Sequence, residues 1–132
     1  MNLYEAVGGE ATFLALTDAF YDRVAADPSL RPLFPPNMEP GKRRLAGFLI
    51  ESLGGPAHWS ASRHFGHLVN AHHRRQFTEE ERDAWINHML AAIDAVGISS
   101  PARPILREWI IQNANLALSH RPLRPAVITV PE

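Results

Sequence analysis

The chain of 132 residues contains no cysteine, so it can form no disulfide, offer no thiolate to a metal and use no thiol as a nucleophile. No apolar run approaches the ~18 residues that a membrane-spanning helix needs. Thirteen basic residues against 14 acidic ones leave a net charge of −1, which gives no general attraction to nucleic acid or to an anionic membrane. The start of the chain also lacks the features of a signal peptide, and we expect a cytoplasmic protein.

The spacing of the apolar residues predicts helices and no strand, and therefore an all-α protein. The helix that starts after Thr78 opens on a capping box, with Glu81 three residues after the Thr78 hydroxyl, and Gly97 should end it. Helices of unequal length fit large crossing angles around a pocket better than a regular bundle. We expect helices at about 10–26, 40–53, 65–72, 78–96 and from 101 on.

Prolines mark the end of the chain, where Pro122, Pro125 and Pro131 disfavour a helix. We therefore expect one helical domain over residues 1–120 and an extended proline-rich tail over residues 121–132. The inner faces of three expected helices follow from their apolar spacing. They comprise Phe13, Leu16, Phe20 and Val24; Leu45, Phe48, Leu49, Ser52 and Leu53; and Trp85, Met89, Ala92, Ile93 and Val96.

One short helix combines an apolar face with a histidine. Phe65, Leu68, Val69 and His72 follow the spacing i, i+3, i+4 and i+7, so they share one face. A histidine aimed into an apolar interior needs a partner, because an unpaired buried polar group costs roughly 1–3 kcal/mol. A backbone group is the ordinary partner, and a buried metal centre such as haem iron is the other.

Three features favour a bound cofactor over an ordinary core histidine. Polar aromatic side chains, Tyr21 and Trp85, lie among apolar residues, and glycine-rich turns bracket the helices. Arginines near the same helices could bind the carboxylates of an amphiphilic ligand. These arginines are Arg43, Arg44, Arg63, Arg74 and Arg75.

The histidine-rich stretch from His64 to His73 also permits a zinc site by its spacing. At about 100° per residue, however, His64, His67 and His73 point roughly 90° or more away from the stripe that carries His72. No single face gathers three of these side chains, which disfavours zinc. The remaining histidines are expected at the surface: His58, His88 and His120.

Four segments of the chain resemble the truncated haemoglobins, particularly the second group of that family: LYEAVGG, AFYDRVAADPSLRPLFP, LGGP at Leu53–Pro56 and ERDAW at Glu81–Trp85. The resemblance covers roughly Leu3 to Leu118. In this family the histidine that binds the iron lies thirteen residues before the tryptophan of ERDAW, and that position is His72. The resemblance implies a truncated globin fold, a 2-over-2 helical sandwich around haem b (iron protoporphyrin IX).

The resemblance also implies roles for individual residues. Tyr21 and Trp85 correspond to the distal hydrogen-bond donors. Gly41 lies where globins can carry a distal histidine, so no distal histidine is expected and ligand entry at this position should be open. Phe34 resembles an aromatic that packs on the haem, and Phe77 should line the pocket below the tryptophan. Arg44 and Trp59 fall where the family often contacts the propionates, and Leu45, Phe48 and Leu49 resemble the distal wall. If His72 binds iron, its Nδ1–H should donate to a carbonyl one helical turn back, for which Leu68 is the candidate.

The function implied by the resemblance is binding of O2, and of other diatomic ligands such as NO or CO, at a pentacoordinate iron. A role in oxygen transport follows, with the protein a monomer or a weak homodimer. The alternative on the same haem is an enzyme, either an NO dioxygenase or a peroxidase-type enzyme that reduces peroxide with an external reductase or electron donor. A third possibility without haem is a helical interaction domain.

Overall fold

A computed structural model of the chain describes residues 1–57, 77–118 and 128–131, with side chains for all of these except 115–118. The expected helix that carries His72 lies outside the described residues, as do Trp59 and Leu68. Within the described ranges every regular element is a helix, and one isolated bridge pairs Asn2 with Thr129. The all-α expectation is therefore confirmed, and none of the described helices has the length and apolar character to span a membrane.

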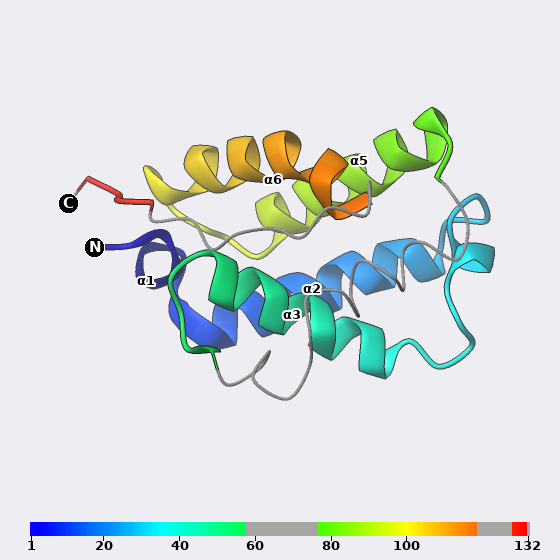
Figure 1. The fold of residues 1–132 in the computed structure, drawn as a ribbon, viewed down its shortest axis with the longest axis horizontal. Coiled ribbons are helices and arrows are strands. Elements are labelled where there is room, and N and C mark those ends of the chain that lie inside the picture. Colours follow the sequence, from blue (N-terminus) through cyan, green and yellow to red (C-terminus); the bar gives the residue numbers. More distant parts are fainter. Residues whose placement is uncertain (58–76, 119–127, 132) are drawn as a thin grey trace.

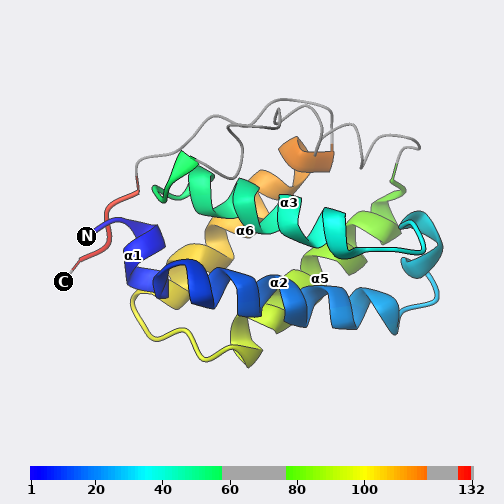
Figure 2. The ribbon, with the colours of Figure 1, turned by 90° about the horizontal axis from the view of Figure 1, so that it is seen from below.

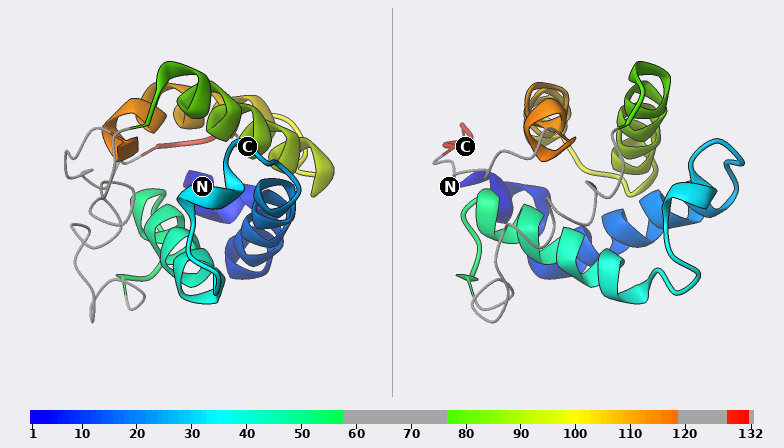
Figure 3. Two further views of the ribbon diagram at one scale, coloured as in Figure 1. Left: turned by 90° about the vertical axis from the view of Figure 1, so that its right-hand side faces the viewer. Right: turned by 45° about the vertical axis from the view of Figure 1, so that its right-hand side comes forward.

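The helices form two layers. In Figure 1, α2 and α3 lie below α5 and α6, and Figure 3 shows the same two layers from two other sides. Figure 2 shows α2 and α3 side by side. Helix α2 packs against both α3 and α5, α5 packs against α6, and α1 contacts α2 and α6. The elements are α1 (Leu3–Val7), α2 (Gly9–Ala25), the 3-10 helix η1 (Arg31–Leu33), α3 (Glu39–Ser52), α5 (Glu79–Ala95) and α6 (Ala102–Leu118).

The apolar faces expected from the sequence form the core. Phe13, Leu16, Phe20 and Val24 of α2 are fully buried, because α2 is covered by α3 on one side and by α5 on the other. The capping box of α5 is also confirmed, since Glu81 N–H donates to Thr78 Oγ1 over 3.1 Å. Thr78 N–H in turn donates to Glu81 Oε1 over 2.9 Å, so two backbone donors at the start of α5 are satisfied.

The N-terminus holds a short helix that was not predicted from the sequence. Five residues are too few for a helical repeat of apolar side chains, but α1 begins with a second capping box, in which Glu5 N–H donates to Asn2 Oδ1 over 2.8 Å. Asn2 Nδ2 also donates to the carbonyl of Gly54, and Tyr4 N–H donates to the carbonyl of Leu53. The N-terminus is thereby attached to the turn that ends α3.

The turn after α3 requires glycine at two successive positions. Gly54 has φ +104°, in the region that side chains disfavour, and α3 ends just before it, as expected. A Cβ on Gly55 would lie 2.7 Å from the ring of Tyr4, so only glycine lets the turn approach the N-terminal segment this closely.

The described end of the tail contacts the N-terminus. Val130 N–H donates to the carbonyl of Met1 over 2.9 Å, and Leu3 N–H donates to the carbonyl of Ile128 over 3.1 Å. The side chain of Val130 is buried in the main core. The two ends of the described chain therefore stabilise each other, although they are far apart in the sequence.

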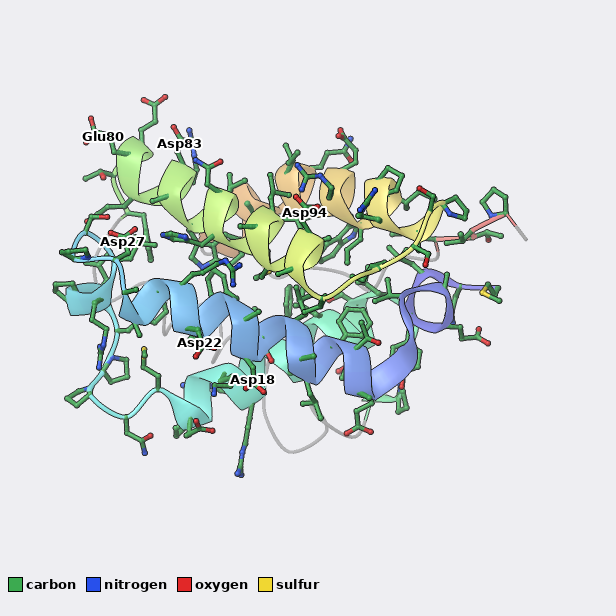
Figure 4. All side chains as sticks on the ribbon, turned by 180° about the vertical axis from the view of Figure 1, so that it is seen from behind. Asp18, Asp22, Asp27, Glu80, Asp83 and Asp94 are labelled. Carbon is green, nitrogen blue, oxygen red and sulfur yellow. The ribbon has the colours of Figure 1, made fainter. Side chains whose placement is uncertain are left out.

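One histidine expected at the surface is instead half-buried and holds two helices together. Nε2 of His88, on α5, lies 2.7 Å from Oδ2 of Asp27, just after α2. Figure 4 shows Asp27 between the end of α2 and α5. This hydrogen bond, supported by two from Ser29, lowers the pKa of Asp27 from 3.8 to about 2. The surface expectation for His88 is wrong because the chain turns at Asp27 toward the middle of α5.

We expect Asp27→Asn to destabilise the protein at about pH 6–7, and urea unfolding across a pH series measures this. The pKa of Asp27 is lower in the folded than in the unfolded chain, so its stabilisation is fully present above about pH 4. That contribution is lost as the pH falls through the folded value of about 2, and the difference from the parent protein should shrink there. Asp22→Asn, at an exposed carboxylate of α2, is the control; equal losses in both variants would contradict the assignment.

Candidate functional site

Two polar aromatic side chains are buried in adjoining helices. Tyr21 on α2 is 5% exposed and Trp85 on α5 is 3% exposed. Phe20 lies between them, with edge-on ring contacts at centroid distances of 5.4 Å to Tyr21 and 5.3 Å to Trp85. These three rings therefore set the relative positions of a phenol hydroxyl and an indole N–H in the middle of the fold.

Burial controls the chemistry of the Tyr21 hydroxyl. Loss of solvent raises the pKa of Tyr21 far above its usual value, and the nearby Arg44 cation opposes only part of that rise. The hydroxyl therefore stays protonated at neutral pH and can donate a hydrogen bond. Phe34, just after η1, packs edge-on against the Tyr21 ring at 5.8 Å and limits its movement.

The expected wall residues of α3 lie on its buried side. Leu45, Phe48 and Leu49 are 2%, 5% and 1% exposed, and all three belong to the core cluster that contains Tyr21 and Trp85. Their apolar side chains exclude water from this side of the site, which strengthens any hydrogen bond formed there. The structure thus brings together three expected wall residues and two expected donors.

Gly41 determines how closely α3 approaches the Tyr21 hydroxyl. A Cβ at this position would lie 3.2 Å from Oη of Tyr21, closer than most real contacts of a Cβ, and 3.8 Å from Nη2 of Arg44. Glycine therefore leaves room for the hydroxyl and the guanidinium on the same side of α3.

Arg44 lies about one helical turn after Gly41 on α3, and its side chain is half-buried. Its Nε is shielded from solvent and has no hydrogen-bond partner among the described residues. The side chain also lies close enough to Tyr21 to affect the pKa of that hydroxyl. Arg44 thus offers a donor and a positive charge to a bound group.

Of the remaining expected site residues, the structure describes only Phe77. Phe77 is described and half-buried, immediately before the cap of α5. His72, Trp59 and Leu68 lie outside the described residues, so their roles stay predictions, as does the zinc alternative. In the described part of the chain, no three histidine or acidic side chains gather where they could hold a metal ion.

The contacts of Phe20 with both Tyr21 and Trp85 were not predicted from the sequence. The sequence placed Phe20 next to Tyr21 and on the inner face of α2, which indicated burial but not these contacts. Spacing along one helix could not show that the ring would also contact Trp85 of α5, because that contact depends on how the helices cross.

The chemistry of the described residues fits a haem. This cofactor requires apolar contact for its flat ring, donors beside the ligand position and cations for its carboxylates. The α3 wall supplies apolar surface, Tyr21 and Trp85 supply donors, and Arg44 supplies a half-buried cation whose Nε has no hydrogen-bond partner among the described residues.

Comparisons with known proteins agree with this chemistry. A family profile described as bacterial-like globin matches residues 2–118. The group 2 truncated hemoglobin YjbI of Bacillus subtilis (strain 168) is 37% identical over 117 residues, which cover 89% of this chain and 85% of that protein. The crystal structure of hemoglobin from Chloroflexus aurantiacus matches with 42% identity and a TM-score of 0.82, covering 89% of this chain and 98% of the other.

A second similar structure is the truncated oxygen-avid haemoglobin from Bacillus subtilis. It is 33% identical, has a TM-score of 0.79, and the match covers 89% of this chain and 99% of that one. Sequence, fold and the chemistry of the site thus agree over nearly the whole helical part of the chain. The chain belongs to the bacterial-like globins, as a truncated haemoglobin of the second group.

Proposed function

We propose that this chain binds haem b and uses it to bind O2 and other diatomic ligands reversibly, with Tyr21 and Trp85 as the hydrogen-bond donors of the ligand pocket. The observation that carries the proposal is the pair of buried donors from two helices, held in place by the Phe20 ring between them. The similar haemoglobin from Bacillus subtilis is oxygen-avid, which supports the same function here.

A haem bound in this pocket would supply an iron with one open position for a gas ligand, and His72 is the proposed iron ligand. The protein's own part is to select the ligand and to set how long it stays. Tyr21 remains protonated because burial raises its pKa, so its hydroxyl donates to a ligand that takes up negative charge. A hydrogen bond to a charged group contributes ~1.5–3 kcal/mol, equivalent to about tenfold to a hundredfold in dissociation rate.

Leu45, Phe48 and Leu49 of α3 are buried and apolar, and they keep water away from the Tyr21 hydroxyl and the Trp85 indole N–H. Phe34 and Phe20 both make edge-on contacts with the Tyr21 ring, and these contacts restrict the movement of that ring. This rigidity lets the pocket stabilise a ligand without first having to order the donor.

The first test is whether the purified protein contains or takes up haem. We expect a red protein with a Soret band, whose visible spectrum changes when dithionite reduces the iron. His72→Ala should abolish normal haem ligation, whereas His73→Ala, its matched control, should leave the spectrum nearly unchanged. The reverse result would transfer the iron ligand to His73, and a colourless protein that cannot take up hemin would exclude the haem function.

The second test concerns the donors. We expect Tyr21→Phe and Trp85→Phe each to accelerate O2 dissociation, by about tenfold or more where the hydrogen bond is fully lost, as measured by stopped-flow mixing. Tyr4→Phe and Trp109→Phe are matched controls, since Tyr4 stacks on Phe13 and Trp109 lies on α6. Changes of less than about twofold in both donor variants would show that the assignment of the distal donors is wrong.

A further inference from the structure

A short hydrogen bond attaches α5 to the chain just after α2 (Figure 4). Nε2 of His88 lies 2.7 Å from Oδ2 of Asp27, and the two side chains are only 25% and 21% exposed. Asp27 is itself held in place, because the backbone N–H and the hydroxyl of Ser29 donate to its Oδ1 over 2.9 and 2.7 Å. Its carbonyl also accepts from the N–H groups of Leu30 and Arg31. The carboxylate is therefore a fixed acceptor for α5 rather than a mobile surface group.

The direction of this hydrogen bond follows from the charge of Asp27. The contacts with His88 and Ser29 lower the pKa of Asp27 to about 2, so the group is a carboxylate at neutral pH and can only accept. Nε2 of His88 must therefore carry a hydrogen and donate it. A bond to an ionised acceptor is stronger than one between neutral groups, and it weakens steeply when its angle departs from linear. His88 is thus held in one position relative to the end of α2.

His88 and Trp85 lie on the same side of α5. Residues three apart are neighbours on a helix surface, so a constraint on His88 also acts on the turn that carries Trp85. Trp85 is 3% exposed, and its ring contacts Phe20 of α2 at a centroid distance of 5.3 Å. Helix α5 is therefore attached to α2 and its end at two places, by a ring contact at Trp85 and by a hydrogen bond at His88.

The second attachment restricts a motion that the first one permits. A helix held at one contact can pivot about that contact, whereas a further contact about one turn away prevents the pivot. The indole N–H of Trp85 lies at the far end of a long side chain, so a small pivot of α5 changes its direction. Because hydrogen bonds weaken steeply with angle, such a change would weaken donation by this N–H.

A second polar attachment of α5 serves as a comparison. Nη1 of Arg107, on α6, lies 2.8 Å from Oδ2 of Asp94 and 3.3 Å from the carbonyl oxygen of Leu90. Asp94 follows Trp85 by nine residues, which is about two and a half turns of α5. Loss of the Asp94 carboxylate should therefore leave the turn that carries Trp85 in place.

We propose that His88 and Asp27 are positioning residues for Trp85, which hold its indole N–H in the direction that the ligand pocket requires and so slow the release of a bound gas. Both act through α5 and need not touch the ligand. The inference rests on the proposed function, because it takes Trp85 as a donor of the pocket. It adds a polar contact outside the pocket that determines how well this donor is aimed.

The test is a double-mutant cycle on the haem-loaded protein, with O2 dissociation measured by stopped-flow mixing. We expect His88→Leu, which removes the donor to Asp27, to accelerate O2 release about threefold or more in a protein that contains Trp85. The same change should have less than about a twofold effect in a Trp85→Phe background, because the donor that it would misdirect is absent. His88→Gln should restore most of the wild-type rate, since its amide N–H can donate to Asp27.

Two spectroscopic readouts separate the aim of Trp85 from a general loosening of the fold. In the ferrous CO form, the indole N–H resonance of Trp85, identified by its absence in Trp85→Phe, should shift in His88→Leu. The C–O stretching frequency should rise in the same variant, because a donor beside the ligand lowers it. Asp94→Asn is the matched control, and it should leave both readouts and the rate of O2 release unchanged.

Equal acceleration by His88→Leu with and without Trp85 would overturn the inference, as would an O2 release rate within about twofold of wild type in the single variant. If His88→Leu yields no haem-loaded protein, Asp27→Asn enters the same cycle, because it removes the charge that strengthens the bond. The proposed function survives either failure as long as Trp85→Phe by itself accelerates O2 release. A Trp85→Phe variant that releases O2 at the wild-type rate would instead contradict the donor role of Trp85 and this inference together.

Discussion

The contact of Phe20 with both Tyr21 and Trp85 holds the site together. It joins the two layers of the fold at their centre, since Tyr21 belongs to α2 and Trp85 to α5. Edge-on aromatic contacts favour one relative orientation of the rings beyond what apolar burial alone provides. The phenol hydroxyl and the indole N–H are therefore positioned by the same packing that stabilises the core, and the pocket needs no separate scaffold.

Helix α3 completes the site through an unusual combination of residues at its first turns. Gly41 removes a side chain where the Tyr21 hydroxyl comes close, and Nη2 of Arg44 lies 3.8 Å from the point that a Cβ on Gly41 would occupy. Lys42, two residues before Arg44, is paired with Asp18 and Glu39, whereas Arg44 forms no ion pair with a described residue.

Local rules predicted much of the fold. The apolar faces of α2 and α5 and the capping box at Thr78 were correct, because helical periodicity and capping depend on residues within one or two turns. Helix α1, the burial of Val130 and the pair between Asp27 and His88 were not predicted. The burial of Val130 and the pair between Asp27 and His88 depend on segments distant in the sequence, whereas the start of α1 had a local signal in the Asn2–Glu5 capping box that was not used.

The residue types available to the site follow from the amino-acid sequence alone: no thiolate, two candidate donors in Tyr21 and Trp85, an apolar wall and a set of arginines. Together with the resemblance, the sequence also identified the family and the helices that carry the donors. The proximity of Arg44 to the Tyr21 hydroxyl, and the space that the missing side chain of Gly41 leaves between them, became apparent only in the folded chain. This is because the direction and environment of a side chain depend on how α2 and α3 pack, and neither helix specifies that packing alone.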